Sequence, residues 1–325
     1  MKVLVSGAGG FLGRHVVDRL LERGHKVRAI IRPASREPSW TSGVEIVRAD
    51  LRVHVKLVST FDGIDAVLHL AAATSGNEDI QFASTVIATE RFLDAMVLSS
   101  VKRLIHVSSL VVYDWARSKS VMDEDTPLLN DIYDMGPYTI AKVWQERVVS
   151  RVARTQAWDL TIMRPGFIWG PQHAEIAGMG RRLGRNYVVF GPFTRLPLCH
   201  VINCANCLVA AVESPNTVGK NFNVIDGDQI RVWRYVREYA RRTGEGGVLV
   251  PVPYQLGLGV AHVALFVSRT FFGKKGKLPS LLTPRRFESQ FKPIRFSNQK
   301  LREVLAWSPP LGFDECLNLT YGSAK

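Results

Sequence analysis

Cysteine is scarce in this sequence, and repeats, low-complexity tracts and long uninterrupted apolar runs are absent. Four cysteines among 325 residues do not suggest a disulfide framework, so we expect a protein of a reducing compartment. The first residues lack the charged and apolar regions of a secretory signal peptide, and we expect no such signal. Together these absences favour a globular, cytoplasmic protein, with 46% hydrophobic residues to build a core.

Three of the cysteines lie in one short segment, at Cys199, Cys204 and Cys207, and His200 lies among them. A structural zinc site needs four well-spaced ligands, and two of these would have to project from one short strand. The favoured interpretation is that the cysteines occupy apolar positions on a strand and the following helix. We therefore expect no metal site.

Acidic residues are in the minority: 29 aspartates and glutamates stand against 42 lysines and arginines, which gives a formal net charge of +13. Such a surplus attracts phosphate-bearing ligands, anionic membranes and polyanions, and does not choose among them. The basic residues are spread along the chain, without a known nucleic-acid motif. We expect a solvated basic surface and no nucleic-acid partner.

What the sequence does contain is a regular alternation of strand-like and helix-like segments. This alternation is typical of a parallel sheet with helices on both faces. The expected fold class is therefore α/β, with a Rossmann-type doubly wound parallel sheet. Strands are predicted at residues 2–6, 25–31, 44–47, 65–70, 103–107 and 159–164, and helices at residues 11–23, 81–99 and 138–155.

The alternation breaks after the sixth predicted strand, where glycine, proline and arginine become frequent. We predict a dinucleotide-binding domain over residues 1–165 and a smaller substrate-binding lobe over residues 166–197 and 226–325. Further strands are predicted at residues 198–202 and 221–225, with a helix between them, and these elements are expected to return to the first domain.

A glycine-rich turn lies between the first strand and the first helix. Gly7 would allow a tight turn, Gly10 would let a pyrophosphate approach closely, and Gly13 would let the helix pack against the sheet. The helix N-terminus would then present free N–H groups to the phosphates. The pattern predicts a dinucleotide site built from Gly7, Gly9, Gly10, Phe11, Leu12 and Gly13.

The residue at the end of the second strand usually determines whether such a site prefers NAD or NADP. An acidic residue there binds the ribose 2′-hydroxyl, whereas an arginine pairs with a 2′-phosphate. This chain has Arg32 at that position, with Arg36 as support, and no acid. We predict a preference for NADP(H), with NAD(H) as the alternative if Arg32 is only an exposed surface residue.

Three further residues form a candidate catalytic set. Ser109 follows the fifth strand, and Tyr138 and Lys142 lie one turn apart on a predicted helix, so they share a face. A nearby ammonium would lower the pKa of Tyr138 and make it a general acid or base. Lys142 would also bind the cofactor ribose, and Ser109 would hold the reacting oxygen of the substrate.

These motifs resemble the extended short-chain dehydrogenase/reductase family over nearly the whole chain. The resemblance implies an adenine contact at Asp50 and Leu51, and a homodimer formed through two helices beside the sheet. It also implies that residues 298–307 form the family's final short helix. Further cofactor contacts are implied at Leu70, Ala71 and Ala72 beside the fourth strand, and at Pro165, Gly166, Phe167 and Ile168 in the loop after the sixth strand.

The branch of the family is indicated by two positions. Leu110 stands where dehydratases typically carry an acid, which disfavours dehydration. Phe167 stands where many nucleotide-sugar epimerases carry an asparagine. The chain looks more like the 3β-hydroxysteroid dehydrogenase and dihydroflavonol reductase branches, in which Phe167 and Trp169 would line an apolar pocket. The alternative is that both are ordinary packing residues.

We therefore predict an NADP-dependent oxidoreductase that acts on a secondary alcohol or ketone of an apolar small molecule. Two alternatives remain open. One is a nucleotide-sugar epimerase with the same catalytic set, in which Arg181, Arg182 and Arg185 would bind a substrate diphosphate rather than form a solvated helix face. The other is a non-catalytic NAD(P)-binding regulator.

The segment 256–272 is strongly apolar but too short and interrupted to predict a membrane span. We favour a buried lid helix over the substrate. Because Lys274, Lys275 and Lys277 follow, peripheral membrane contact through residues 256–277 is the alternative.

Overall fold

A seven-stranded parallel sheet forms the centre of the computed structural model, which describes residues 1–36, 38, 40, 42–53, 57–132, 134–245, 247–272 and 282–322. The strand order is β12-β7-β5-β4-β1-β2-β3, and every neighbouring pair is parallel. The predicted α/β doubly wound fold is confirmed. The strands are β1 (Lys2–Ser6), β2 (Lys26–Ile31), β3 (Val44–Arg48), β4 (Ala66–His69), β5 (Arg103–Val107), β7 (Asp159–Pro165) and β12 (Asn221–Val224).

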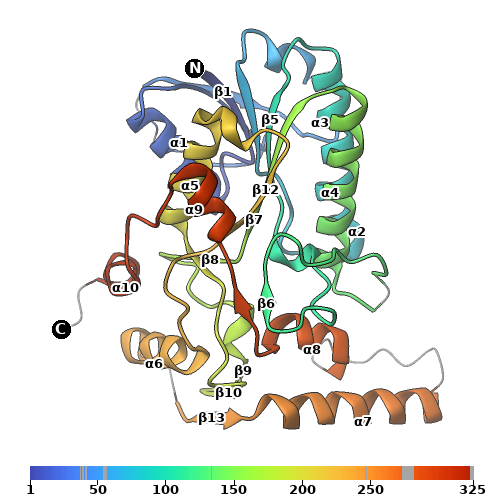
Figure 1. Cartoon of the computed structure of the whole chain (residues 1–325). Helices are drawn as coiled ribbons and strands as arrows, with labels where there is room; N and C mark the ends of the chain where they lie inside the picture. The colour runs from blue at the N-terminus through green and yellow to red at the C-terminus, as the bar shows by residue number, and fades with distance from the viewer. Residues whose placement is uncertain are drawn as a thin grey trace.

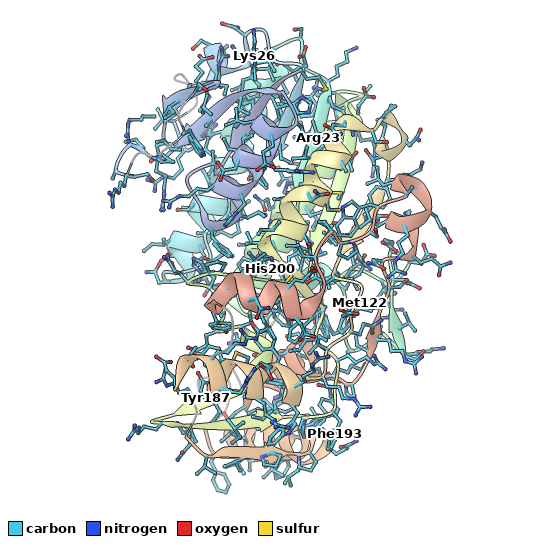
Figure 2. The ribbon with its side chains drawn as sticks, turned by 90° about the vertical axis from the view of Figure 1, so that its left-hand side faces the viewer. Arg23, Lys26, Met122, Tyr187, Phe193 and His200 are labelled. Carbon is cyan, nitrogen blue, oxygen red and sulfur yellow. The ribbon has the colours of Figure 1, made fainter. Side chains whose placement is uncertain are left out.

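Helices cover both faces of this sheet (Figure 1). On one face α1 (Phe11–Glu22) packs against α5 (Val201–Glu213), and Arg23 lies between them (Figure 2), its guanidinium 2.9 Å from the carboxylate of Glu213. The other face carries α2 (Glu78–Phe82), α3 (Ala88–Val97) and α4 (Pro137–Thr155), with a π-helical stretch at Ala83–Ile87 joining α2 to α3. Both faces of the central strands are therefore buried, which explains why these strands are mainly apolar.

The strand predicted at residues 198–202 is shorter than expected. β11 (Leu198–His200) pairs with β8 (Phe167–Trp169) in a separate two-stranded sheet, and α5 begins at Val201. The carboxylate of Asp226 accepts hydrogen bonds from the backbone N–H of His200 (2.8 Å) and from the Asn203 amide (2.9 Å). These bonds from a distant loop begin the helix where the local apolar pattern indicated a strand.

The cysteines lie as predicted, on a strand and the helix after it. Cys199 is in β11, Cys204 and Cys207 are on α5, and all three are buried. Burial raises the pKa of the Cys199 and Cys207 thiols. Among the residues that the structure describes, no group of three or more His, Cys, Asp or Glu side chains is placed to hold a metal ion.

A smaller sheet lies at the other end of the molecule, with the order β13-β10-β9. Its strands are β9 (Arg181–Leu183), β10 (Asn186–Phe190) and β13 (Leu249–Val252). Arg181, Arg182 and Arg185 therefore lie on or beside a β-hairpin, so their placement on a helix face is wrong. Arg182 pairs with Glu245 at 2.9 Å. The division into a cofactor domain and a substrate lobe stays a prediction.

The apolar segment forms α7 (Tyr254–Phe272), which lies along the lower edge of the molecule in Figure 1. One face of α7 packs against α8 (Pro284–Phe291), and large apolar side chains on the other face are exposed. The expectation of a buried lid is therefore wrong. No helix within the described ranges has the length and apolar character needed to cross a membrane.

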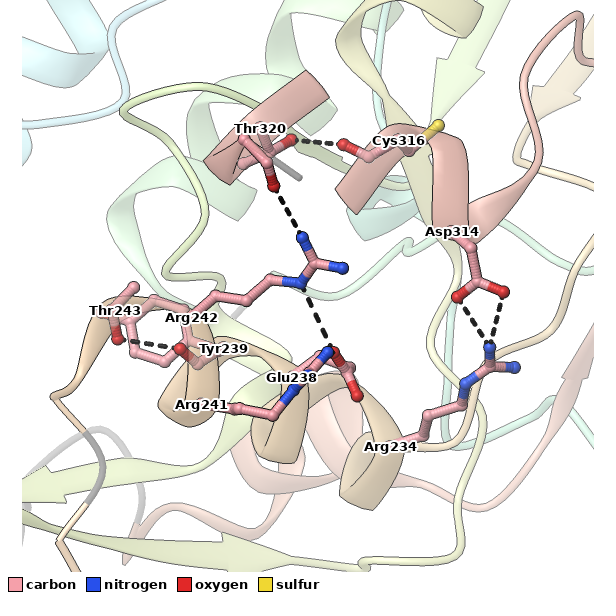
Figure 3. A network of polar contacts seen from close by, with 10 residues as sticks. Arg234, Glu238, Tyr239, Arg241, Arg242, Thr243, Asp314, Cys316 and Thr320 are labelled. Atoms are coloured by element: carbon pink, nitrogen blue, oxygen red, sulfur yellow. Dashed lines mark hydrogen bonds and ion pairs between the residues drawn. The ribbon is translucent and has the colours of Figure 1, made fainter. Parts of the chain in front are cut away.

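The C-terminal part folds back along the molecule. The helix expected at residues 298–307 is present as α9 (Gln299–Leu305), but it is not the final one, because α10 (Phe313–Tyr321) follows. Figure 3 shows α10 held to α6 (Val232–Thr243) by the pair Arg234–Asp314, at 2.9 Å. The remaining short elements are β6 (Val121–Met122), β14 (Arg295–Phe296) and the 3-10 turns Val58–Phe61, Leu110–Val112, Ala177–Met179 and Pro215–Thr217.

Candidate active site

The glycine turn joins β1 to α1 in a conformation that side chains would block. Gly7 has a φ of +70°, and a Cβ added there would lie 2.9 Å from the backbone nitrogen of Ala71. A Cβ on Gly13 would lie 2.2 Å from the carbonyl oxygen of Gly7. The turn closes with a hydrogen bond from the Gly10 N–H to the Gly7 carbonyl, at 3.0 Å. The first turn of α1 therefore lies directly against the end of β1.

This arrangement fits a bound pyrophosphate. Gly10 is the N-cap of α1 and carries no side chain that could occupy the N–H groups of the first turn. Those N–H groups and the positive end of the helix dipole face the carboxyl edge of the sheet. Gly9, Phe11 and Leu12 complete the turn, and Leu70, Ala71 and Ala72 continue from β4 beside it.

The tip of β2 holds the residues expected to contact the adenosine ribose. The side chain of Arg32 is exposed there, and its carbonyl accepts a hydrogen bond from the Ser35 N–H at 2.9 Å. Arg48 on β3 donates to the carbonyls of Pro33 (3.1 Å) and Ser35 (2.8 Å), which fixes this loop. The Ser35 hydroxyl lies 3.9 Å from where a Cβ on Gly9 would be.

Sequence reasoning missed Ser35. The signal that could have found it is a hydroxyl residue three positions after the arginine that follows the second strand.

Asp50 and Leu51 follow β3, where the resemblance implied an adenine contact. The carboxylate of Asp50 is bonded to the guanidinium of Arg52 at 2.6 Å, and this hydrogen bond lowers the pKa of Asp50. Asp50 is thus held ionised at the edge of the sheet. Whether its side chain or the backbone of Leu51 meets the adenine stays a prediction.

The structure brings Ser109 and Tyr138 together. Ser109 caps the short 3-10 turn after β5, and Tyr138 lies in the first turn of α4. Burial raises the pKa of the Tyr138 phenol, whereas a hydrogen bond with Ser109 lowers it. Two hydroxyl groups therefore meet at the carboxyl edge of the sheet, where ligands bind in doubly wound folds.

Lys142 lies one helical turn beyond Tyr138 and is 2% exposed. Its ammonium donates to the carbonyl of Val107 at 2.8 Å and to the side-chain oxygen of Gln145. Burial lowers the pKa of Lys142 to about 7, and the nearby charge of Glu146 opposes this shift. A lysine whose charge is gained or lost near neutral pH suits a role in controlling the ionisation of Tyr138.

Gln145 connects Lys142 to a buried chain of polar groups. Its amide nitrogen donates to the Thr89 hydroxyl at 2.8 Å and to the Ala71 carbonyl at 2.9 Å. The imidazole of His69 then bonds to Thr89 at 2.9 Å and to the Ser6 hydroxyl at 2.7 Å. This chain ties the lysine to the ends of β1 and β4, beside the glycine turn.

The pattern Tyr-x-x-x-Lys did not reveal Gln145. Its position, one turn after the lysine on the same helix face, is the signal that could have done so.

The loop after β7 is anchored by backbone bonds. The Gly166 N–H donates to the Val224 carbonyl at 3.1 Å, and the Phe167 N–H donates to the Pro197 carbonyl at 2.7 Å. A Cβ on Gly166 would lie 2.0 Å from the Pro197 carbonyl oxygen, so a side chain has no room there. Pro165 to Ile168 are thereby fixed at the carboxyl edge of the sheet.

Phe167 and Trp169 have different surroundings. Phe167 is half-buried, whereas Trp169 is fully buried and packs on Tyr235 and Phe313, with ring centroids 5.4 Å and 5.8 Å away. The interpretation of Trp169 as a pocket wall is therefore wrong, because it belongs to the core of the second half. Phe167 remains a candidate for substrate contact.

A buried ion pair joins α4, the helix that carries Tyr138 and Lys142, to the sheet. The guanidinium of Arg164 on β7 lies 2.6 Å from the carboxylate of Glu146 on α4 and donates to the Tyr113 hydroxyl at 2.8 Å. Tyr113 in turn donates to the side-chain oxygen of Asn223 on β12, also at 2.8 Å. Removing one charge would leave the other buried and unpaired, so the pair fixes how α4 sits on the sheet.

Comparison with known proteins shows which enzymes this chain is similar to. The chain is 27% identical to a 4-hydroxy-2-methyl-3-oxo-4-farnesyl-3,4-dihydroquinoline-1-oxide ketoreductase of Stigmatella aurantiaca, over 81% of this chain and 79% of the relative. It is 27% identical to a 3 beta-hydroxysteroid dehydrogenase/Delta 5-->4-isomerase of Mycobacterium tuberculosis, over 95% of this chain and 86% of that protein.

The fold is shared with solved structures. A UDP-glucuronic acid 4-epimerase of Bacillus cereus, in complex with NAD, matches with a TM-score of 0.72 and 21% identity over 99% of this chain and 97% of the other. The family model described as the NAD dependent epimerase/dehydratase family matches residues 3–242. The chain is an enzyme of the NAD dependent epimerase/dehydratase family, an extended short-chain dehydrogenase/reductase with relatives among the 3β-hydroxysteroid dehydrogenases.

Proposed function

We propose that this enzyme transfers a hydride between NADP(H) and a secondary alcohol or ketone of an apolar molecule. The observation that carries the proposal is the meeting of the Ser109 and Tyr138 hydroxyls one helical turn from the buried Lys142 ammonium. This set lies at the same edge of the sheet as the glycine turn. Hydride and proton transfer can therefore take place on one substrate carbinol group.

The three side chains divide the proton chemistry. Tyr138 gives its phenolic proton to the carbonyl oxygen in reduction, or takes the alcohol proton in oxidation. Ser109 donates a hydrogen bond that holds this oxygen against the phenol. Lys142 stabilises the phenolate and is placed to bind a ribose hydroxyl of the cofactor, which supplies or accepts the hydride when bound.

Burial of Tyr138 raises its pKa, so the phenol alone is a poor base at neutral pH. The positive charge of Lys142, fixed by Val107 and Gln145, opposes this effect. We expect the nicotinamide ring in its oxidised form to add a second positive charge on the same side. The proton acceptor then becomes competent only when the cofactor is in place.

The preference for NADP(H) rests on the tip of β2. Arg32 is exposed beside the loop that Arg48 fixes, and the Ser35 hydroxyl lies near Gly9 of the glycine turn. A guanidinium and a hydroxyl at this place suit the oxygens of a 2′-phosphate. No acidic residue follows β2 directly to select the 2′-hydroxyl of NAD.

The apolar substrate is supported by the residues around the catalytic set. Leu110, a buried apolar residue, directly follows Ser109. The position therefore has no carboxyl group that could protonate a leaving hydroxyl. Phe167 presents a half-buried aromatic ring at the edge of the site. The ketoreductase and the hydroxysteroid dehydrogenase among the relatives are named for ketone and alcohol chemistry.

The test compares two substrate classes with the purified enzyme and each nicotinamide cofactor. We expect stoichiometric oxidation of NADPH with an apolar ketone, such as a 3-ketosteroid, and no turnover of UDP-glucose or UDP-glucuronic acid. Interconversion of a UDP-sugar without net change of the cofactor would replace this proposal with that of an epimerase. A binding titration that favours NADH over NADPH would contradict the cofactor assignment alone.

A further inference from the structure

We propose that α7 docks the enzyme on the surface of an anionic lipid bilayer. The inference concerns a helix outside the catalytic set and does not depend on the substrate of the enzyme. Figure 1 shows β13 and α7 in one line along the lower edge, whereas β1 lies at the upper end.

The inner face of α7 is built from small residues. Gly257, Ala261 and Ser268 are buried, at spacings that place them on one side of the helix. A Cβ on Gly257 would lie 2.4 Å from the ring of Phe287 on α8, so the two helices are in close contact. The most buried positions of α7 hold small residues, Leu258 and Leu265 are half-buried, and the other large apolar side chains lie on the outer face.

The outer face consequently carries large apolar side chains along the whole length of the helix, and Gln255, His262, Arg269 and Thr270 are exposed as well. Soluble proteins rarely expose a contiguous patch of this kind unless it meets another surface. The segment that leads into α7 adds the exposed Val248, directly before β13, and Val250 in β13. The exposed apolar side chains of α7 are Leu256 (60% exposed), Val260 (52%), Val263 (63%), Phe266 (70%), Val267 (40%) and Phe271 (75%).

The charge around this face favours anionic lipid. The sequence has no aspartate or glutamate between residues 246 and 287. Over the same stretch it carries Arg269, which is exposed on α7 between the two outward phenylalanines, and the lysines of the segment that follows the helix. Apolar side chains with a cation among them, and a sequence without acid over this stretch, match the boundary between acyl chains and anionic headgroups.

A second copy of the chain would fit this face less well. Pairing two α7 helices would bring the Arg269 side chains of two copies to one contact, and α7 itself has no acidic residue to neutralise them. A bilayer with acidic headgroups removes this repulsion and covers the apolar side chains at once. Since α7 does not qualify as a membrane-crossing helix, it would lie in the plane of the interface.

The test is co-sedimentation of the full chain with vesicles. We use vesicles of phosphatidylcholine alone and vesicles of equal parts phosphatidylcholine and phosphatidylglycerol. We expect binding to the mixed vesicles that weakens as salt is added, and little binding to the neutral ones. The double variant Phe266→Ser/Phe271→Ser should bind the mixed vesicles at least about tenfold more weakly than the wild type does.

A matched control is available in Leu98→Ser. Leu98 is 65% exposed at the C-terminal end of α3, a helix at the opposite end of the molecule from α7 (Figure 1), and its replacement should leave vesicle binding unchanged. A second variant, Arg269→Glu, should weaken binding to the mixed vesicles only. Thermal unfolding and NADPH binding of each variant show that the fold is retained.

Three results would overturn the proposal. The wild type could fail to bind the mixed vesicles, or the double variant could bind them as well as the wild type does. The third result is a dimer, measured by light scattering, that the double variant dissociates, because α7 would then be a contact between copies of this chain.

Discussion

The seven-stranded sheet and the region around α7 differ in where their large apolar side chains lie. In the sheet, apolar strands are covered on both faces, and the buried polar groups Ser6, His69 and Lys142 are hydrogen-bonded to one another or to the backbone. Around α7, small residues face the protein and large apolar residues face outward. The sheet is complete within one chain, whereas α7 has a face that still needs a partner.

This difference predicts different costs for substitutions in the two regions. A change in the sheet region disturbs contacts that the chain itself supplies, so it should alter folding, cofactor binding or chemistry. A change on the outer face of α7 should leave all three almost unaffected. Each of the following variants tests one side of this comparison.

The largest effect is expected for Tyr138→Phe. Removal of the phenolic hydroxyl leaves no group to exchange a proton with the substrate oxygen, so kcat should fall by about 10²- to 10⁴-fold. NADPH affinity should change little, because the ring and Lys142 remain. Steady-state kinetics with a ketone substrate and a fluorescence titration of NADPH measure the two quantities.

The matched control is Tyr254→Phe, which removes a half-buried hydroxyl on α7 and should retain full activity. Retention of activity by Tyr138→Phe would mean that a different acid serves the reaction.

Gly13→Ala should destabilise the protein and abolish dinucleotide binding. The new Cβ would lie 2.2 Å from the Gly7 carbonyl oxygen, so α1 or the turn must move. Overpacking of this kind costs about 1–3 kcal/mol of unfolding free energy. Urea denaturation gives the stability, and an NADPH titration gives the binding. An unchanged affinity would show that the glycine turn does not hold the pyrophosphate.

Arg32→Asp should reverse the cofactor preference. Loss of a charge-assisted contact to the 2′-phosphate is worth about 1.5–3 kcal/mol, or roughly a tenfold to hundredfold loss of NADPH affinity. The new carboxylate can accept hydrogen bonds from the ribose hydroxyls of NADH, whose binding should improve. The same charge change at the exposed Arg154 should leave both affinities alone. Equal effects at the two sites would reduce the role of Arg32 to general surface charge.

Gln145→Leu should alter the pH dependence of activity rather than the chemistry itself. Burial already lowers the pKa of Lys142 to about 7, so its ammonium is present below that pH and lost above it. Without the Gln145 oxygen the charged form of Lys142 is less favoured, so its pKa should fall further. The pH at which activity is lost should therefore be lower by about one unit than in the wild type. The measurement is the pH profile of kcat/KM.

Two further variants separate this positioning role from a structural one. Gln145→Glu keeps an acceptor and adds a negative charge, so the fall in activity should move to higher pH. Gln156→Leu, at the exposed end of α4, should leave the profile unchanged. A profile that moves the same way in both Gln145 variants would contradict the proposed contact with Lys142.

The sequence predicted the sheet well because its signals are local. The spacing of Gly7, Gly10 and Gly13, the apolar strands and the Tyr138–Lys142 interval can all be read within a few residues. The structure places these residues at one edge of the sheet. Parallel topology alone brings them there, because the carboxyl ends of the strands meet at one edge.

The errors arose where distant residues decide the structure. Asp226 ends the strand at residues 198–200 and begins α5 by hydrogen bonds across the chain. Trp169 is buried by aromatic rings of α6 and α10, which the local pattern does not reveal. The lid interpretation of α7 failed for the same reason: an apolar helix shows that a surface must be covered but not which surface covers it.

The smallest effect, and the one that opposes Gly13→Ala, is expected for Gly259→Ala on α7. Gly259 lies on the exposed side of the helix, and a Cβ added there would meet no described atom within 4 Å. Alanine favours the helix over glycine by about 0.5–1 kcal/mol, so the variant should be slightly more stable in urea denaturation. Activity and NADPH affinity should not change. Replacement of glycine by alanine would thus destabilise the sheet region and stabilise α7, because of the two glycines only Gly13 is in close contact with its own chain. Destabilisation by Gly259→Ala would instead show that the outer face of α7 is already packed.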